Sequence, residues 1–196
     1  MISHGEEFLS IPTICIAEWA MNEKGLWIER GLLGLLIIVE ALMFSAFYNR
    51  EIAPYPPQVY DQAVYLADTY KLQEEISTNG LGALWYELWN PNHAGTLALP
   101  IEGALFGLII GGTRFPQLCV LFVGFCALQI FAFSTAKTVF GDRLYGWMVL
   151  GLVLAQSTLR YQAGGLYDFR IDFLAYSLYG IWVCAIIRSR LFADRR

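Results

Sequence analysis

A short polar segment late in the chain carries the residues best suited to chemistry. Within residues 164–172, the carboxylates Asp168 and Asp172 flank the cation Arg170, and a long apolar run lies on each side. Charged groups next to hydrocarbon are costly, so they usually mark a functional site rather than a spacer. Asp61 is their natural partner, because it lies in the long polar stretch after the first apolar run.

Carboxylates brought together from different loops at a membrane surface could act in two ways. One could be a general base that removes a proton from a substrate hydroxyl. The set Asp61, Asp168 and Asp172 could also bind a divalent cation, Mg²⁺ or Mn²⁺, and Arg170 could pair with a phosphate. The alternative is that these charges only keep loops hydrated and mark the ends of spans, because each acidic residue taken singly is ordinary.

Two further residues are weaker candidates for substrate contact. Tyr65 follows Asp61 by one helical turn, where packing at the membrane interface is the commoner role of a tyrosine. His93 follows Asn-Pro-Asn in a predicted turn, and a lone histidine in a loop is more often incidental. The sequence contains no GxSxG, P-loop, HExxH or dinucleotide-binding motif.

The composition is that of a membrane protein. Of the 196 residues, 57% are hydrophobic and 15% are charged, whereas about a quarter of the residues in a soluble domain are charged. The net charge of −4 and the lack of a basic cluster argue against nucleic acid as a partner. The four cysteines show no metal-ligand spacing, and the acidic N-terminus is unlike a cleaved signal peptide.

The apolar runs predict an all-α, polytopic fold. We expect a cytoplasmic or interfacial N-terminal segment over residues 1–30, a transmembrane module over 31–190 and a basic cytoplasmic tail over 191–196. The predicted spans and loops follow from hydropathy and length: spans at 31–48, 116–136, 145–159 and 173–187, and outer loops at 49–115 and 160–172.

Juxtamembrane helices are expected within the large first outer loop. Apolar residues at helical spacing predict a helix from Tyr60 to Ile76, with Asp61 in its first turn. Residues 95–113 are apolar but contain Pro100, Glu102 and several glycines, so we predict a horizontal or re-entrant helix there.

Charge bias supports this topology. With a cytoplasmic N-terminus, eight Lys and Arg residues lie inside and five outside, and the two counts are exchanged if residues 95–113 cross the membrane. Five spans with the N-terminus outside also leave eight inside, so that alternative stays open. In the four-span topology Asp61, Asp168 and Asp172 all face the non-cytoplasmic side.

In this order of elements, and in two short strings, the chain resembles the N-terminal part of the GT-C glycosyltransferases. The string from Arg160 to Asp168 is similar to the Ala-Gly-x-Tyr-Asp loop of oligosaccharyltransferase catalytic subunits. Arg170-Ile-Asp172 is similar to the Arg-x-Asp of protein mannosyltransferase-like and aminoarabinose-transferase-like members. The segment from Tyr60 to Tyr65 resembles their first acidic motif, and residues 93–114 resemble their juxtamembrane helix.

The resemblance implies inverting transfer of a sugar from a polyprenyl-phosphate donor to an acceptor, at the outer face of a bacterial inner (plasma) membrane. Asp61 would activate the acceptor, and Asp168 and Asp172 would bind metal or orient the donor phosphate. One departure is that Phe169 and Arg170 stand where the oligosaccharyltransferase loop has Asn and an acidic residue. Since such enzymes have eight or more spans, we expect a partial enzyme, inactive alone and working with a complementary membrane subunit.

Two alternatives belong to other classes. The chain could be a non-catalytic membrane subunit or lipid-binding scaffold, in which the acidic loops are only solvated caps. It could also be a small transporter, with Glu40 and Gln129 lining a path. Substitution of the aspartates separates the first of these from an enzyme, because only an enzyme would lose activity while staying folded.

Overall fold

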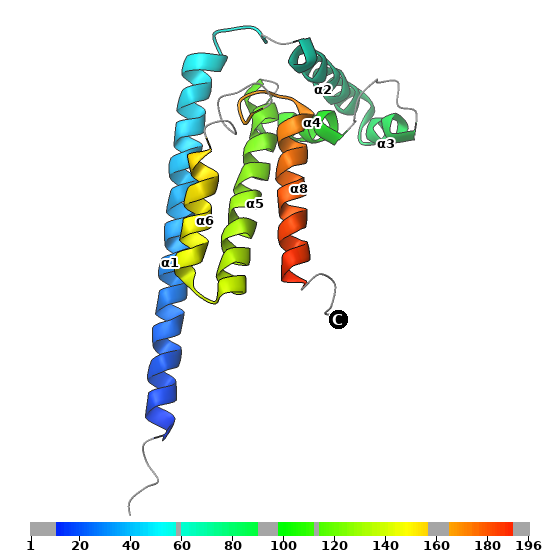
Figure 1. Cartoon of the computed structure of the whole chain (residues 1–196). Helices are drawn as coiled ribbons and strands as arrows, with labels where there is room; N and C mark the ends of the chain where they lie inside the picture. The colour runs from blue at the N-terminus through cyan, green and yellow to red at the C-terminus, as the bar shows by residue number, and fades with distance from the viewer. Residues whose placement is uncertain (1–10, 58–59, 90–97, 112–113, 157–164, 190–196) are drawn as a thin grey trace, which may run out of the picture. The chain divides into compact units, whose positions relative to one another are not determined.

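The computed structural model is all-helical, as the sequence predicts (Figure 1). It describes residues 11–57, 60–89, 98–111, 114–156 and 165–189. In chain order the elements are α1 (Ile11–Phe47), the π-helical turn η1 (Tyr48–Ile52), α2 (Tyr60–Asn79), α3 (Gly82–Trp89), α4 (Ala98–Ile110), α5 (Arg114–Phe140), α6 (Arg143–Ala155) and α8 (Ile171–Arg188).

Three helices are long and apolar enough to cross a membrane. They are Gly25–Ile52, Arg114–Phe140 and Ile171–Arg188, and they contain the whole of the predicted spans 31–48, 116–136 and 173–187. The chain therefore has the helices of a multi-pass membrane protein.

Helix α6 is shorter than the span predicted at residues 145–159. It has 13 residues, or about 20 Å at 1.5 Å per residue, against a hydrocarbon core of about 30 Å. The last three residues of the predicted span, 157–159, lie outside the described part of the chain, as do the start of the second outer loop and the tail at 191–196.

The chain divides into two compact units, residues 1–43 and 44–196. The described part of the first unit is a single helix, because residues 11–43 all belong to α1. The helix continues without a break past residue 30, so the predicted N-terminal segment runs directly into the first apolar run. The guanidinium of Arg30 lies 5.8 Å from the ring centre of Trp27, an aromatic–cation pair suited to a membrane interface.

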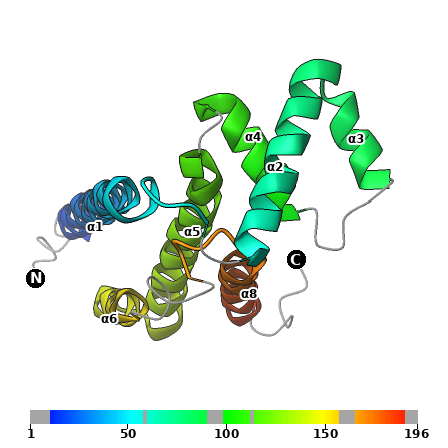
Figure 2. The ribbon, with the colours of Figure 1, turned by 90° about the horizontal axis from the view of Figure 1, so that it is seen from above.

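In the second unit, α2 and α3 form a helical hairpin. The sequence predicted this helix from Val64, Leu72 and Ile76; Leu72 and Ile76 are buried, as are Leu66 and Thr69, whereas Val64 is exposed. The helix ends at Gly80, which has φ of 73° and donates its N–H to the carbonyl of Ile76 at 2.8 Å. This positive φ is the usual reason for glycine after a helix, and it lets α3 fold back beside α2 (Figure 2).

Helix α4 packs between α2 and α5 (Figure 2). It has 13 residues and, like α6, is too short to cross the bilayer as a straight helix. That residues 95–113 do not cross the membrane stays a prediction. The exposed apolar residues Ile109 and Ile110 lie at the C-terminal end of α4.

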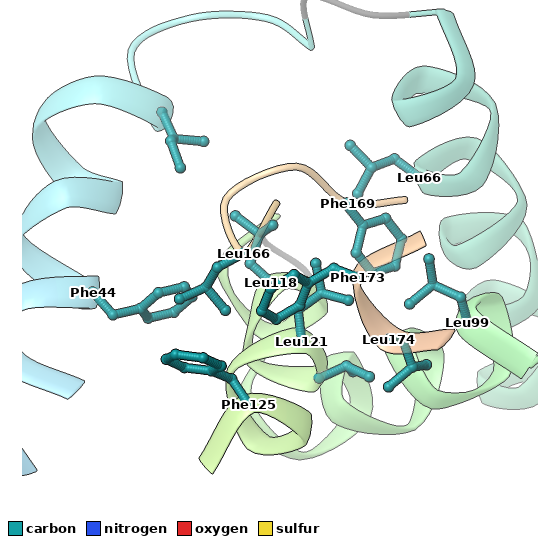
Figure 3. Close-up of a cluster of buried hydrophobic side chains, with 12 residues drawn as sticks. Phe44, Leu66, Leu99, Leu118, Leu121, Phe125, Leu166, Phe169, Phe173 and Leu174 are labelled. Carbon is teal, nitrogen blue, oxygen red and sulfur yellow. The ribbon is translucent and has the colours of Figure 1, made fainter. Parts of the chain in front are cut away.

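Helix α5 is the centre of the second unit, because α4, α6 and α8 all pack against it. Glycines allow these close contacts, as they commonly do in membranes. A Cβ on Gly124 would lie 3.3 Å from Leu174 of α8, and one on Gly146 of α6 would lie 2.9 Å from the Phe133 ring. The main buried cluster joins α5 to α2, α4, α8 and the second outer loop (Figure 3).

Candidate functional site

The described part of the predicted second outer loop contains a three-residue turn centred on Phe169. The N–H of Arg170 donates to the carbonyl of Asp168 at 2.7 Å, and the N–H of Asp168 donates to the carbonyl of Gly165 at 3.0 Å. A hydrogen bond between residues i and i+2 is typical of a γ-turn. The turn holds Asp168 and Arg170 close to each other, with Phe169 between them in the chain.

Aromatic side chains hold this loop on two sides. The ring of Tyr167 stacks on Phe44, with centres 5.5 Å apart, and also contacts Phe47 at 4.1 Å. Phe169 is fully buried in the main hydrophobic cluster, where Figure 3 shows it close to Leu66 of α2. Because the residues on both sides of Asp168 are held in place, its position is defined by packing.

Arg170 joins the two acidic loops. Its Nε donates to Oδ2 of Asp168 at 2.7 Å, and its Nη2 lies 2.7 Å from the same oxygen. Its Nη1 lies 4.0 Å from Oδ2 of Asp61, in the first turn of α2. The structure thus brings together Asp61, Asp168 and Arg170, three of the predicted site residues, from positions more than 100 residues apart in the chain.

The two carboxylates differ in their surroundings. The side chain of Asp168 is 14% exposed and that of Arg170 is 16% exposed, whereas that of Asp61 is 62% exposed. A charge pair at 4.0 Å with one exposed partner contributes about 1 kcal/mol or less, so Asp61 can leave Arg170 at little cost. Asp168 is placed to orient Arg170, and Asp61 is placed to meet a ligand from outside.

Arg114, at the start of α5, is a member of this site that was not among the predicted site residues. Its Nη1 donates to the carbonyl of Tyr55 at 3.0 Å, and its Nη2 donates to Oε1 of Gln62 at 3.4 Å. Gln62 is the neighbour of Asp61, so Arg114 ties the first turn of α2 to α5. A cation two residues before Pro116, at the edge of the clearest apolar run, was the available signal.

The remaining predicted residues lie elsewhere. Asp172 is exposed in the first turn of α8. Asp168 and Asp172 would share a helix face only if α8 began before Asp168. Because α8 begins at Ile171, they do not. Tyr65 is partly buried against the main cluster, in the packing role that was its alternative. His93 lies outside the described residues.

The described carboxylates do not fit a shared cation site as they lie here. Among the described residues, no group of three or more His, Cys, Asp or Glu side chains could hold a metal ion. Arg170 contacts both Asp61 and Asp168, so a cation already fills the role that Mg²⁺ or Mn²⁺ would have between them. The predicted divalent ion stays a prediction.

Burial raises the pKa of two groups on the predicted juxtamembrane helices. Partial burial, with a smaller effect of Tyr48, raises the pKa of Tyr70, while Arg114 acts in the opposite direction. Burial alone raises the pKa of Glu102 on α4, whose Oε2 is buried without a hydrogen-bond partner. Tyr70 is therefore a neutral hydroxyl at physiological pH, near Arg114.

Comparison with known proteins gives no match: no protein-family model matches the chain, and neither a curated protein nor a solved structure is significantly similar to it.

Proposed function

We propose that this chain is the N-terminal module of a membrane glycosyltransferase, which transfers a sugar from a polyprenyl-phosphate donor to an acceptor on the non-cytoplasmic face. One observation carries the proposal. Asp61, the acidic residue of the first predicted outer loop, pairs with Arg170 of the second, which also pairs with Asp168. Two loops that only solvated the ends of spans would not need to meet.

In the proposed reaction Asp61 is the general base. It accepts the proton of the acceptor hydroxyl as the hydroxyl oxygen bonds to the anomeric carbon of the donor sugar. The bond from that carbon to the phosphate oxygen breaks, and the electron pair leaves with polyprenyl phosphate, so the anomeric configuration inverts. Arg170 stabilises the charge on the leaving phosphate, and Asp168 holds the guanidinium in position.

The rest of the predicted set completes this proposal. Asp172, Tyr65 and His93 remain proposed substrate contacts, with Asp172 on α8 at the same end as the loop turn. Helix α6 is proposed as a fourth, shorter span, for which flanking arginines could reach the interface. The location is a bacterial inner membrane with the site facing outward, and the partner is a complementary membrane subunit that supplies the further spans.

The experiment compares Asp61→Asn and Asp168→Asn with Glu74→Gln. Glu74 is an exposed carboxylate on the same helix as Asp61, which makes it a matched control. Membrane vesicles from cells that express the chain, which also contain the proposed complementary subunit, would be given a panel of radiolabelled polyprenyl-phosphate hexoses, and release of label from the lipid would be measured. Loss of a general base lowers such rates by about 10²–10⁴-fold.

We expect Asp61→Asn to lower the rate of label release at least 10²-fold and Asp168→Asn to lower it less. The rate of Glu74→Gln should match that of the wild type. Equal rates in Asp61→Asn and wild type, in vesicles that release label, would remove Asp61 from the chemistry.

A non-catalytic membrane subunit or lipid-binding scaffold is the second candidate, and one observation favours it. Both carboxylates contact Arg170, whose side chain is mostly buried, so the role of the cluster could be purely structural: its ion pairs would hold the two loops together. In that case Asp168→Asn would lower the melting temperature, and no variant would change transfer of label in any vesicle preparation.

A further inference from the structure

Phe169 is the one side chain of the second-loop turn that enters the core completely. Its exposed fraction is 0%, although its neighbours Asp168 and Arg170 remain at the surface of the site. In Figure 3 its ring lies near Leu66, Leu99 and Phe173, which come from α2, α4 and α8. The ring therefore contacts the elements that carry or adjoin the proposed site.

The seat of this ring includes a glycine of α4. A Cβ placed on Gly103 would lie 3.0 Å from Cζ of Phe169, 2.9 Å from Cγ2 of Thr69 and 3.4 Å from Cγ of Gln117. The first two distances are shorter than ordinary carbon contacts of about 3.5–4.0 Å. Only glycine lets α4 approach α2, α5 and the Phe169 ring together at this position.

We propose that Phe169 is a positioning residue, and that Gly103 of α4 is the seat that fixes it. The backbone of the three-residue turn is tightly constrained, because the N–H of Arg170 donates to the carbonyl of Asp168 across Phe169. A displacement of the ring must therefore move the backbone that carries Asp168 and Arg170. The position of α4, a helix of the first outer loop, thereby sets the position of the charged pair in the second.

An effect of Phe169 on catalysis rests on the proposed function, but its effect on the position of Arg170 does not. The experiment therefore measures the accessibility of Arg170. Phenylglyoxal modifies accessible guanidinium groups, and mass spectrometry of the full chain reports each arginine separately. Arg170 is mostly buried and paired with Asp168, so it should react slowly in the wild type. Arg50, whose side chain is 85% exposed, is the fast-reacting internal reference.

The variant Gly103→Ala should raise the modification rate of Arg170 severalfold relative to that of Arg50. Gly146→Ala is the matched control, because its Cβ would also lie 2.9 Å from a phenylalanine ring, that of Phe133. Its crowding lies between α5 and α6 and also involves the carbonyl oxygen of Phe133, at 3.1 Å. A folded Gly146→Ala variant should leave the rate at Arg170 unchanged.

Two double variants decide which contact transmits the effect. Gly103→Ala with Phe169→Leu removes the ring atom that the new methyl group meets, and should restore slow modification of Arg170. Gly103→Ala with Thr69→Ser removes Cγ2 of Thr69 and should leave modification fast.

Either of two results would overturn the proposal: an unchanged rate in a folded Gly103→Ala variant, or restoration by the Thr69 change and not by the Phe169 change. If Gly103→Ala fails to fold, Phe169→Leu alone still tests the idea. With glycine at position 103, no methyl group fills the space that the smaller leucine leaves, so the turn should loosen and the rate at Arg170 should rise. An unchanged rate would contradict us. None of these outcomes depends on sugar transfer, so they stand apart from the test of the proposed function.

Discussion

Asp61 and Asp168 are chemically identical side chains that the fold gives different tasks. Asp168 is held between the anchored residues Tyr167 and Phe169 and accepts both short contacts from Arg170. Asp61 is exposed and meets the same arginine only at 4.0 Å. A base must be able to leave its resting partner and reach a substrate, which favours Asp61, and an orienting group must not move, which favours Asp168.

The raised pKa of Glu102 predicts the direction in which the stability of the folded chain changes with pH. Burial raises the pKa of this carboxyl in the folded chain, so the folded state binds its proton more tightly than the unfolded state. The contribution of Glu102 to stability is then most favourable below the unfolded pKa, and it is lost as pH rises through the folded pKa.

Glu102→Gln should therefore be more stable than the wild type at neutral pH and should approach it in acid. Melting temperatures of both proteins in detergent, from about pH 4 to pH 8 around the ordinary carboxyl pKa, would check this. A difference between the two proteins that is constant over the range would show that Glu102 is not the titrating group. Exposed Glu74→Gln provides the control, for which the difference should stay near zero.

At the scale of elements, Arg114 connects α5 to the first turn of α2. Its guanidinium contacts the carbonyl of Tyr55 and the amide of Gln62 at once, which the single ammonium of lysine cannot reproduce. Arg114→Lys should lose about 0.5–1.5 kcal/mol of local stability in this turn, and amide hydrogen exchange should be up to about tenfold faster there.

Hydrogen exchange followed on a peptide covering residues 60–69 would measure that change. Arg50→Lys is the control, since Arg50 pairs only with its exposed neighbour Glu51 in the structure. Equal exchange in Arg114→Lys and wild type would mean that packing of Leu66, rather than Arg114, holds the start of α2.

The helices themselves were largely predictable from sequence. Periodic apolar residues identified α2 to within three residues at its C-terminal end, and the length of the apolar runs identified the regions of three membrane helices. Both signals depend only on residues close together in the chain, so they can be recognised without knowledge of the fold. The extent of α6 was not predicted, because the predicted span continued to residue 159 through the polar residues after Ala155, whereas the helix runs from Arg143 to Ala155.

The site was only half predictable, for a physical reason. Charges at the ends of apolar runs marked Asp61, Asp168 and Arg170, because the cost of placing them near lipid is visible in the sequence. Which charge contacts which depends on the turn at Phe169 and on the approach of α4 at Gly103, and these are long-range features. The sequence therefore placed Asp61, Asp168 and Arg170 in one site without showing that Arg170 contacts both carboxylates.

At the scale of the whole molecule, the proposed site exists only if both outer loops face one compartment. This requires that α5 and the shorter α6 both cross the bilayer and that α4 does not, because only then do α2, the start of α5 and the start of α8 lie on the same side. The topology is thus the claim on which the glycosyltransferase proposal depends most.

Cysteine accessibility in intact cells tests that claim most directly. In a chain whose four native cysteines are replaced, single cysteines would be placed at the exposed positions Tyr60 and Asp172, and at Val139 near the opposite end of α5. A maleimide that cannot cross membranes should label positions 60 and 172 from outside, and position 139 only after permeabilisation. Labelling of only one of positions 60 and 172 from outside would separate Asp61 from Asp168 and Arg170 by a bilayer and contradict the account.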